Sequence, residues 1–75
     1  MKRYINLLQE IYRYTGDDTE KHISTDRVVL LADNLGFGRR STWELITFLI
    51  EKHYIKFDTI GYFVITHKGI YEATF

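Results

Sequence analysis

The sequence contains no cysteine. Neither disulfide bonds nor thiolate-bound zinc can therefore hold the fold together, and a thiol nucleophile is excluded as well. The 75 residues suffice for one domain, and at this size the burial of apolar side chains barely outweighs the entropy lost on folding. We therefore expect a single domain over residues 1–75, stabilised by hydrophobic packing alone.

The composition is that of a globular domain. Hydrophobic residues make up 45% of the chain and charged residues 27%, which favours a packed core over disorder. After the basic start, Asn6, Gln9 and Glu10 interrupt the apolar run that a signal peptide needs, and no stretch is long enough to cross a bilayer. We expect a cytoplasmic protein that does not enter membranes.

The chain is electrically neutral, with ten basic and ten acidic residues. Proteins that bind nucleic acid usually carry a basic excess, because neutralised phosphates and released counterions provide most of the affinity. That excess is absent here. The overall charge by itself therefore does not favour a nucleic-acid partner.

Residues 3–14 have apolar side chains at helical spacing, and Thr15-Gly16 ends this first predicted helix. Its apolar side covers about half of the circumference, whereas a core-facing stripe needs only about 100°. We therefore expect part of this side, at Tyr4, Leu7 and Ile11, to contact another chain.

A second helix is predicted between a capping residue and a closing glycine. Ser24 or Thr25 can accept hydrogen bonds from the first free amides, and Gly36 can adopt the left-handed conformation that ends a helix. A tight turn over residues 36–40 follows, and it leads directly into another helical segment.

A third helix is predicted from Thr42 to about His53. Ser41 and Glu44 have the S-x-x-E spacing of a capping box, in which each side chain satisfies one free amide at the helix start. Winding the residues at about 100° each defines the side that should face the core. These inward positions are Thr42, Leu45, Ile46 and Leu49.

Residues 54–65 have the pattern of two short strands that turn at 58–61, and Thr66 can cap a last short helix. A two-stranded ribbon is marginal alone, so the hairpin must pack against the helices. The residues expected to pack are Tyr54, Phe57, Tyr62, Val64 and Ile65. The predicted fold class is mainly α with a small β-hairpin (α+β), with three helices, two strands and a short C-terminal helix.

Two segments carry a resemblance to a known superfamily. LADNLGFGRRSTWELITFLIEKHYIKF, residues 31–57, resembles the second helix, turn, third helix and first wing strand of winged helix-turn-helix proteins, without insertion. YFVITHKGIYEA, residues 62–73, resembles their second wing strand and the I-T-x-x-G segment that follows it. His53 departs from the pattern, because the superfamily often has glycine at the end of the third helix.

The resemblance implies a winged-helix fold, with the third helix in the DNA major groove and the hairpin, or wing, on the adjacent backbone. The fold alone does not decide the function, because it serves DNA-binding regulators and protein-interaction modules alike. The implied outward face of the third helix comprises Arg40, Ser41, Trp43, Glu44, Thr47 and Glu51. The implied wing tip is residues 58–61, with Lys56 and Tyr62 beside it.

The first functional hypothesis is a small regulator of transcription that binds double-stranded DNA. An arginine fork can hold a phosphate or a guanine edge, and free amides at a helix start attract anions. The residues expected near base edges are Arg40, Ser41, Trp43 and Thr47, and those expected on phosphates are Arg39, Lys56 and Lys68. The alternative readings are a solvated turn for the arginines and a purely stabilising role for the hairpin.

Two carboxylates weaken this hypothesis. Glu44 and Glu51 would face the groove, where phosphates repel them and the amino group of cytosine is the one good base partner. Glu44 would be withdrawn from the surface if it belongs to the capping box, and Glu51 stands late enough in the helix to lie outside the DNA groove. The two carboxylates therefore weaken the hypothesis without removing it.

The second functional hypothesis is a protein-interaction module without DNA binding. Trp43 lies in line with Ile50 and Tyr54, and an aromatic stripe at helical spacing is more often core or interface than a base-stacking platform. Together with the wide apolar side of the first helix, this stripe indicates a homodimer or contact with another protein.

Enzyme chemistry has no support in the sequence. His22, His53 and His67 are too scattered for a local metal motif. No phosphate loop, dinucleotide fingerprint, nucleophile elbow or pair of catalytic carboxylates occurs. We therefore expect no cofactor, metal, small-molecule substrate or catalytic residue.

Overall fold

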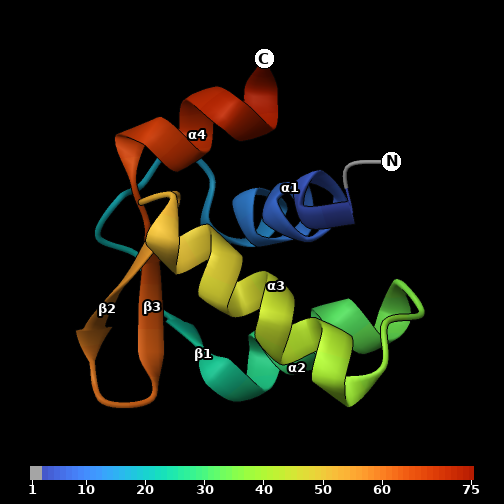
Figure 1. Cartoon of the computed structure of the whole chain (residues 1–75). Helices are drawn as coiled ribbons and strands as arrows, with labels where there is room; N and C mark the ends of the chain where they lie inside the picture. Colours follow the sequence, from blue (N-terminus) through green and yellow to red (C-terminus); the bar gives the residue numbers. More distant parts are fainter. Residues whose placement is uncertain (1–2) are drawn as a thin grey trace.

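Four helices and a three-stranded antiparallel sheet make up the computed structural model, which describes residues 3–75 (Figure 1). In chain order the elements are α1 (Arg3–Thr15), β1 (Ile23–Ser24), α2 (Thr25–Asn34), α3 (Arg39–Glu51), β2 (Ile55–Thr59), β3 (Tyr62–Ile65) and α4 (His67–Thr74). The predicted α+β class is confirmed, and the sheet has one strand more than the sequence predicted. No helix within residues 3–75 is long and apolar enough to span a membrane.

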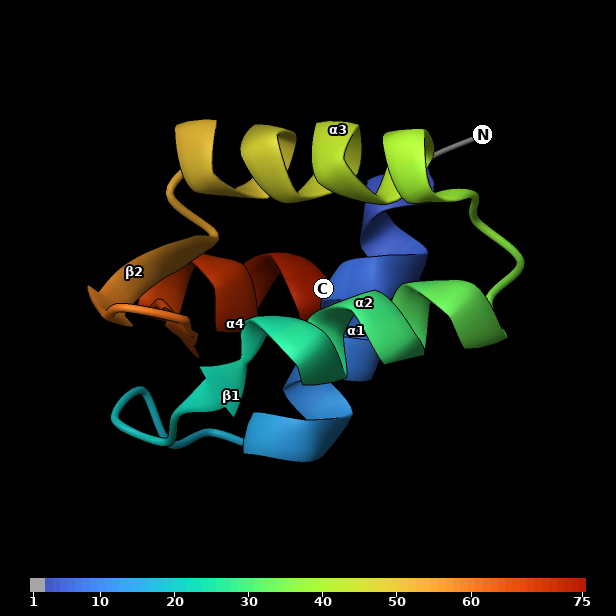
Figure 2. The ribbon, with the colours of Figure 1, turned by 90° about the horizontal axis from the view of Figure 1, so that it is seen from below.

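Helix α1 lies at the centre of the fold, where α2, α3, α4 and two strands pack against it (Figures 1 and 2). Leu7 and Ile11 are completely buried, so the prediction that they contact another chain is wrong. The wide apolar side of α1 packs within the chain itself, because α4 covers α1 in addition to α2 and α3.

Tyr4, the remaining predicted contact residue of α1, is half-buried against the end of the chain. Its ring lies 4.8 Å from that of Phe48, and its hydroxyl donates a hydrogen bond to Glu72, 3.0 Å away. This hydrogen bond raises the pKa of the Tyr4 hydroxyl, and desolvation and the charge of Glu72 act in the same direction. The contact ties α1 to α4.

Strand β1 was not predicted, because two residues are too short to show the alternation that marks a strand. It pairs with β3 at Ile23 and Ser24, so that β3 becomes the central strand in the order β1-β3-β2. The hairpin turn is bonded to the residues around β1. The Thr25 amide and hydroxyl both donate to the Gly61 carbonyl, at 2.8 and 3.0 Å, and His22 pairs with Asp58.

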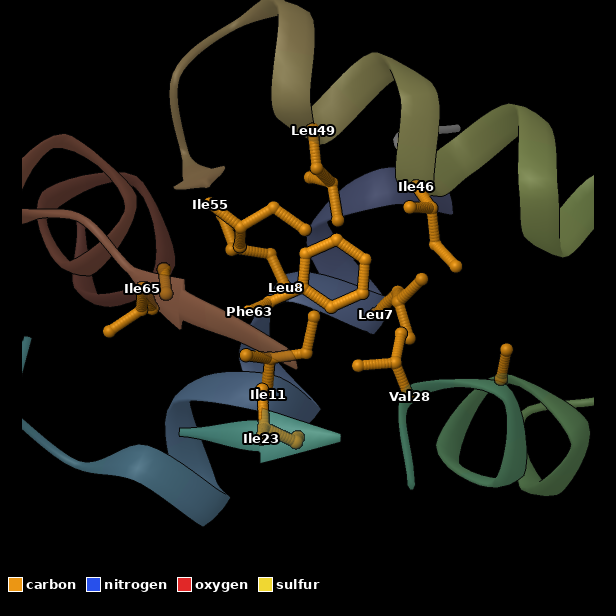
Figure 3. Packing of buried hydrophobic residues seen from close by; sticks show 12 residues of the cluster. Leu7, Leu8, Ile11, Ile23, Val28, Ile46, Leu49, Ile55, Phe63 and Ile65 are labelled. Carbon is orange, nitrogen blue, oxygen red and sulfur yellow. The ribbon is translucent and has the colours of Figure 1, made fainter. Parts of the chain in front are cut away.

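The hairpin packs on the core through Phe63, which was not among the residues predicted to pack. Figure 3 shows the Phe63 ring surrounded by core side chains from α1, α3 and β2. Val64 and Ile65 are buried as predicted, whereas Phe57 is 61% and Tyr62 44% exposed. Phe57 pairs with Phe63 but lies on the edge strand, which leaves one side uncovered, and Tyr62 points to the other face of the sheet.

The predicted cap of α2 is confirmed. The Ser24 side chain accepts a hydrogen bond from the Arg27 amide at 3.1 Å, and Gly36 adopts a φ of 88° just beyond the helix end. The predicted cap of the last helix is also confirmed, because the Thr66 hydroxyl accepts a hydrogen bond from the Gly69 amide at 2.9 Å.

The predicted capping box of the third helix is wrong. Helix α3 begins at Arg39 rather than Thr42, with Gly38 as a cap that offers no side chain. The Gly38 carbonyl already accepts hydrogen bonds from the amide and the hydroxyl of Thr42, at 2.9 and 3.0 Å, and this closes the first turn. Ser41 and Glu44 therefore lie inside the helix.

His53 occupies the position just beyond α3 with a left-handed φ of 63°. Its amide donates to the Ile50 carbonyl and the Tyr54 amide donates to the Leu49 carbonyl, at 3.0 and 2.9 Å. These two bonds form a Schellman motif, in which glycine is preferred because it has no side chain to clash. Histidine thus occupies a left-handed position at which winged helix-turn-helix proteins often have glycine.

We expect His53→Gly to stabilise the domain by about 0.5 to 1 kcal/mol, because relief of the left-handed strain exceeds the added entropy of the unfolded chain. Urea unfolding would measure the change. His67→Gly is the matched control, since it removes an exposed histidine from a right-handed helical position and should cost up to about 1 kcal/mol. If His53→Gly were less stable than the wild type, the backbone at His53 would not be strained.

Candidate functional site

Helix α3 forms an outer layer of the molecule, with one side on the core and the other exposed along its length (Figure 2). Thr42, Ile46 and Leu49 are buried and Leu45 packs against the core. The predicted inward side is therefore confirmed. The opposite side is free to meet a partner.

A shallow groove runs along the outward face of α3. Its lining residues are Arg40, Trp43, Glu44, Thr47, Phe48 and Glu51. Five of these belong to the predicted outward face. Phe48 was missed, because its contact with Tyr4 depends on where α1 packs. We call these six residues the α3 groove.

Ser41 lies beside the α3 groove, in a hollow that shares Glu44 and Phe48 with it. It is partly buried and lines this hollow together with Arg3, Tyr4 and Leu45. Ser41 therefore lies closer to α1 than the prediction beside base edges required. The reason is the early helix start, which puts Ser41 in the first turn on the side where α1 packs.

Trp43 is the exposed member of the predicted aromatic stripe, with 45% of its surface accessible. Ile50 and Tyr54 pack against the core instead. The Tyr54 ring lies 6.0 Å from the Tyr4 ring in a stacked arrangement, and the Lys68 ammonium lies 5.6 Å from its centroid. The stripe is therefore not a continuous surface, and only its Trp43 end is open.

The start of α3 carries the strongest positive character of this surface. Arg39 and Arg40 are both exposed, and neither forms an ion pair with any of residues 3–75. Gly38 provides no side chain to cap the first amides, so the positive end of the helix dipole remains open. Two guanidinium groups at such a helix start suit a phosphate or another anion.

The two predicted lysine contacts lie away from these arginines. Lys56 pairs with Val64 across the sheet and lines a hollow formed by the loop 16–22, the hairpin and the start of α4. Lys68 stands at the start of α4 beside Tyr54, which follows the opposite end of α3. The structure brings Arg39 and Arg40 together but does not bring the lysines to them.

The hairpin tip carries apolar side chains rather than cations. Ile60 is 98% exposed, and it lines a hollow at the hairpin turn together with Phe57. The acidic Asp58 is engaged by His22. A tip of this kind is poorly suited to hold phosphate, so contacts with phosphate near α3 must come from cations outside the tip, such as Arg39 and Arg40.

Within residues 3–75, no group of three or more histidine or acidic side chains is placed to hold a metal ion. Comparison with known proteins adds no assignment. No family model, curated protein or solved structure matches the chain.

Proposed function

We propose that the chain is a small winged-helix protein that binds duplex DNA through α3 and regulates transcription. The observation that carries this proposal is the exposed side of α3, which begins with two arginines that form no ion pair with any of residues 3–75, beside amides that no side chain among them caps. The order of the elements supports the winged-helix assignment, because the β2–β3 hairpin follows α3 directly and lies beside its C-terminal part (Figures 1 and 2).

The dimensions of α3 suit the major groove. A helix of 13 residues is about 20 Å long, and the groove, about 12 Å wide, admits one helix. In this arrangement Arg39 holds a phosphate, while Arg40 and Thr47 reach base edges from the α3 groove. Trp43 adds apolar contact with the wall of the DNA major groove.

The neutral net charge limits how much of the affinity for DNA can come from phosphate contacts. With Arg39 as the main phosphate contact and Arg40 on a base edge, about one counterion is released, so the logarithm of affinity should fall with the logarithm of salt with a slope near −1. Non-specific binding should therefore be weak. Most of the discrimination must come from contacts with the bases.

We expect the double substitution Arg39→Ala and Arg40→Ala to weaken duplex binding at least about tenfold at low salt and to flatten the salt slope toward zero. Fluorescence anisotropy with a labelled duplex, between about 50 and about 200 mM salt, measures both quantities. The matched control is Arg13→Ala with Lys21→Ala, which removes the same charge near the loop 16–22 and should change little.

An unchanged affinity in the double arginine variant would contradict this assignment. A wild-type chain that does not bind duplex even at low salt would overturn DNA binding altogether. The second candidate function, a protein-interaction module, would then be favoured by the 45% exposed Trp43 on the same groove. Both outcomes come from the same titration.

A further inference from the structure

Glu44 lies in the middle of the α3 groove, one helical turn after Arg40. It is exposed and takes no part in a capping box, because the helix begins five residues earlier. It also forms no ion pair with any of residues 3–75. A free carboxylate therefore stands at the centre of the surface that we assign to DNA.

A carboxylate at this position selects strongly among base edges. Phosphates repel it, and an ionised carboxylate only accepts hydrogen bonds, so its desolvation must be offset by a donor. The major groove offers donors only at the amino groups of cytosine and adenine. In adenine the neighbouring N7 is an acceptor that repels a second acceptor, whereas cytosine presents its N4 amino group without one.

We propose that Glu44 is a specificity-determining residue that accepts a hydrogen bond from a cytosine N4 amino group in the major groove. The proposal rests on the DNA-binding function above and names the bases that this surface takes. Arg40, four residues earlier and thus about 6 Å along the helix axis, is placed for the O6 and N7 atoms of a guanine. The target site should therefore contain a cytosine and a guanine within about two base pairs of each other, since base pairs rise about 3.4 Å each.

The carboxylate also accounts for specificity in a neutral protein. Sites that place an acceptor of guanine or thymine opposite Glu44 leave its carboxylate desolvated and unpaired, so the wrong sites are penalised rather than the right site merely rewarded. Glu51 provides an internal comparison. It lines the same groove with the same charge, but it is the last residue of α3, about 10 Å further along the axis.

The test is selection from a pool of randomised duplexes with the wild-type chain, Glu44→Gln and Glu51→Gln. Wild-type sites should share a cytosine at one fixed position. Glu44→Gln should lose that cytosine and favour adenine, because an amide can pair with both N6 and N7 of adenine. Glu51→Gln makes the same change in charge and should keep the cytosine.

Fluorescence anisotropy with the selected duplex then measures how much affinity the cytosine contributes. Changing the cytosine to thymine, which presents an acceptor in place of the donor, should weaken the wild-type chain about 5- to 150-fold. The same change should alter the affinity of Glu44→Gln by less than about threefold. Equal thermal unfolding of the three chains would show that the fold is unaffected, as expected for exposed side chains.

The outcomes separate this inference from the proposed function. If the wild-type chain binds duplexes but its selected sites carry no cytosine that depends on Glu44, the base assignment is overturned and DNA binding stands. The same holds if Glu51→Gln changes the preference as much as Glu44→Gln. If no duplex binds, both proposals are wrong.

Discussion

Gly69→Ala should destabilise the domain by about 3 kcal/mol or more, because overpacking against the backbone cannot be relieved by a rotamer change. A Cβ added at Gly69 would lie 2.0 Å from the Tyr54 carbonyl oxygen and 2.9 Å from Ile65 Cγ1. That carbonyl is held in place, since it accepts hydrogen bonds from the amide and the hydroxyl of Thr66 at 3.0 and 3.1 Å. The steric cost outweighs the helix propensity of alanine, which favours it by about 1 kcal/mol.

Urea unfolding followed by circular dichroism measures this change. Gly38→Ala is the matched control, because within residues 3–75 no atom beyond its own chain neighbours lies within 4 Å of the added Cβ, and the backbone φ of −73° suits any residue. Its loss of the glycine cap should cost less than about 1 kcal/mol. A Gly69→Ala chain as stable as the wild type would contradict the close approach of α4 to Tyr54.

Phe63→Ala should cost about 3 to 5 kcal/mol, the range for removing a buried aromatic side chain. Phe63 is completely buried and stands on the central strand, where it pairs with Ile23 on one side and Phe57 on the other. A domain of 75 residues has a total stability of about 4 to 11 kcal/mol. The variant should therefore be partly or largely unfolded without denaturant.

Phe57→Ala is the matched control for this prediction, because it removes the same side chain from the paired position. Phe57 is 61% exposed and its ring lies 4.7 Å from that of Phe63, so the loss should be at most about 1 kcal/mol. Trp43 is the only tryptophan and reports unfolding by its fluorescence. Equal losses in the two variants would show that the core is not centred on Phe63.

Local signals in the sequence predicted most of the fold. The caps at Ser24 and Thr66 act within a few residues of themselves, so they can be recognised without knowledge of the tertiary structure. The start of α3 was placed wrongly, because Gly38 and Ser41 both offer a plausible first turn. The choice between Phe57 and Phe63 depends on β1, whose pairing covers one side of the hairpin and is set by distant residues.

The candidate site was predictable only in part for the same reason. The inward and outward sides of α3 follow from helical geometry, and the buried Ile46 and exposed Trp43 agree with it. The burial of Leu7 could not be foreseen without the position of α4 against α1. The placement of Lys56 depends on which face of the sheet packs on the core, and this is a tertiary property.

The bond between Thr25 and Gly61 joins residues that are 36 positions apart, and it closes a ring of chain that contains α2, α3 and β2. This bond and the neighbouring pair of His22 and Asp58 oppose a movement of the hairpin away from the helices. They therefore help to fix the relative orientation of helix and hairpin in the isolated protein. A rigid partner that touches both would find them in place, and little ordering entropy would be lost when the complex forms.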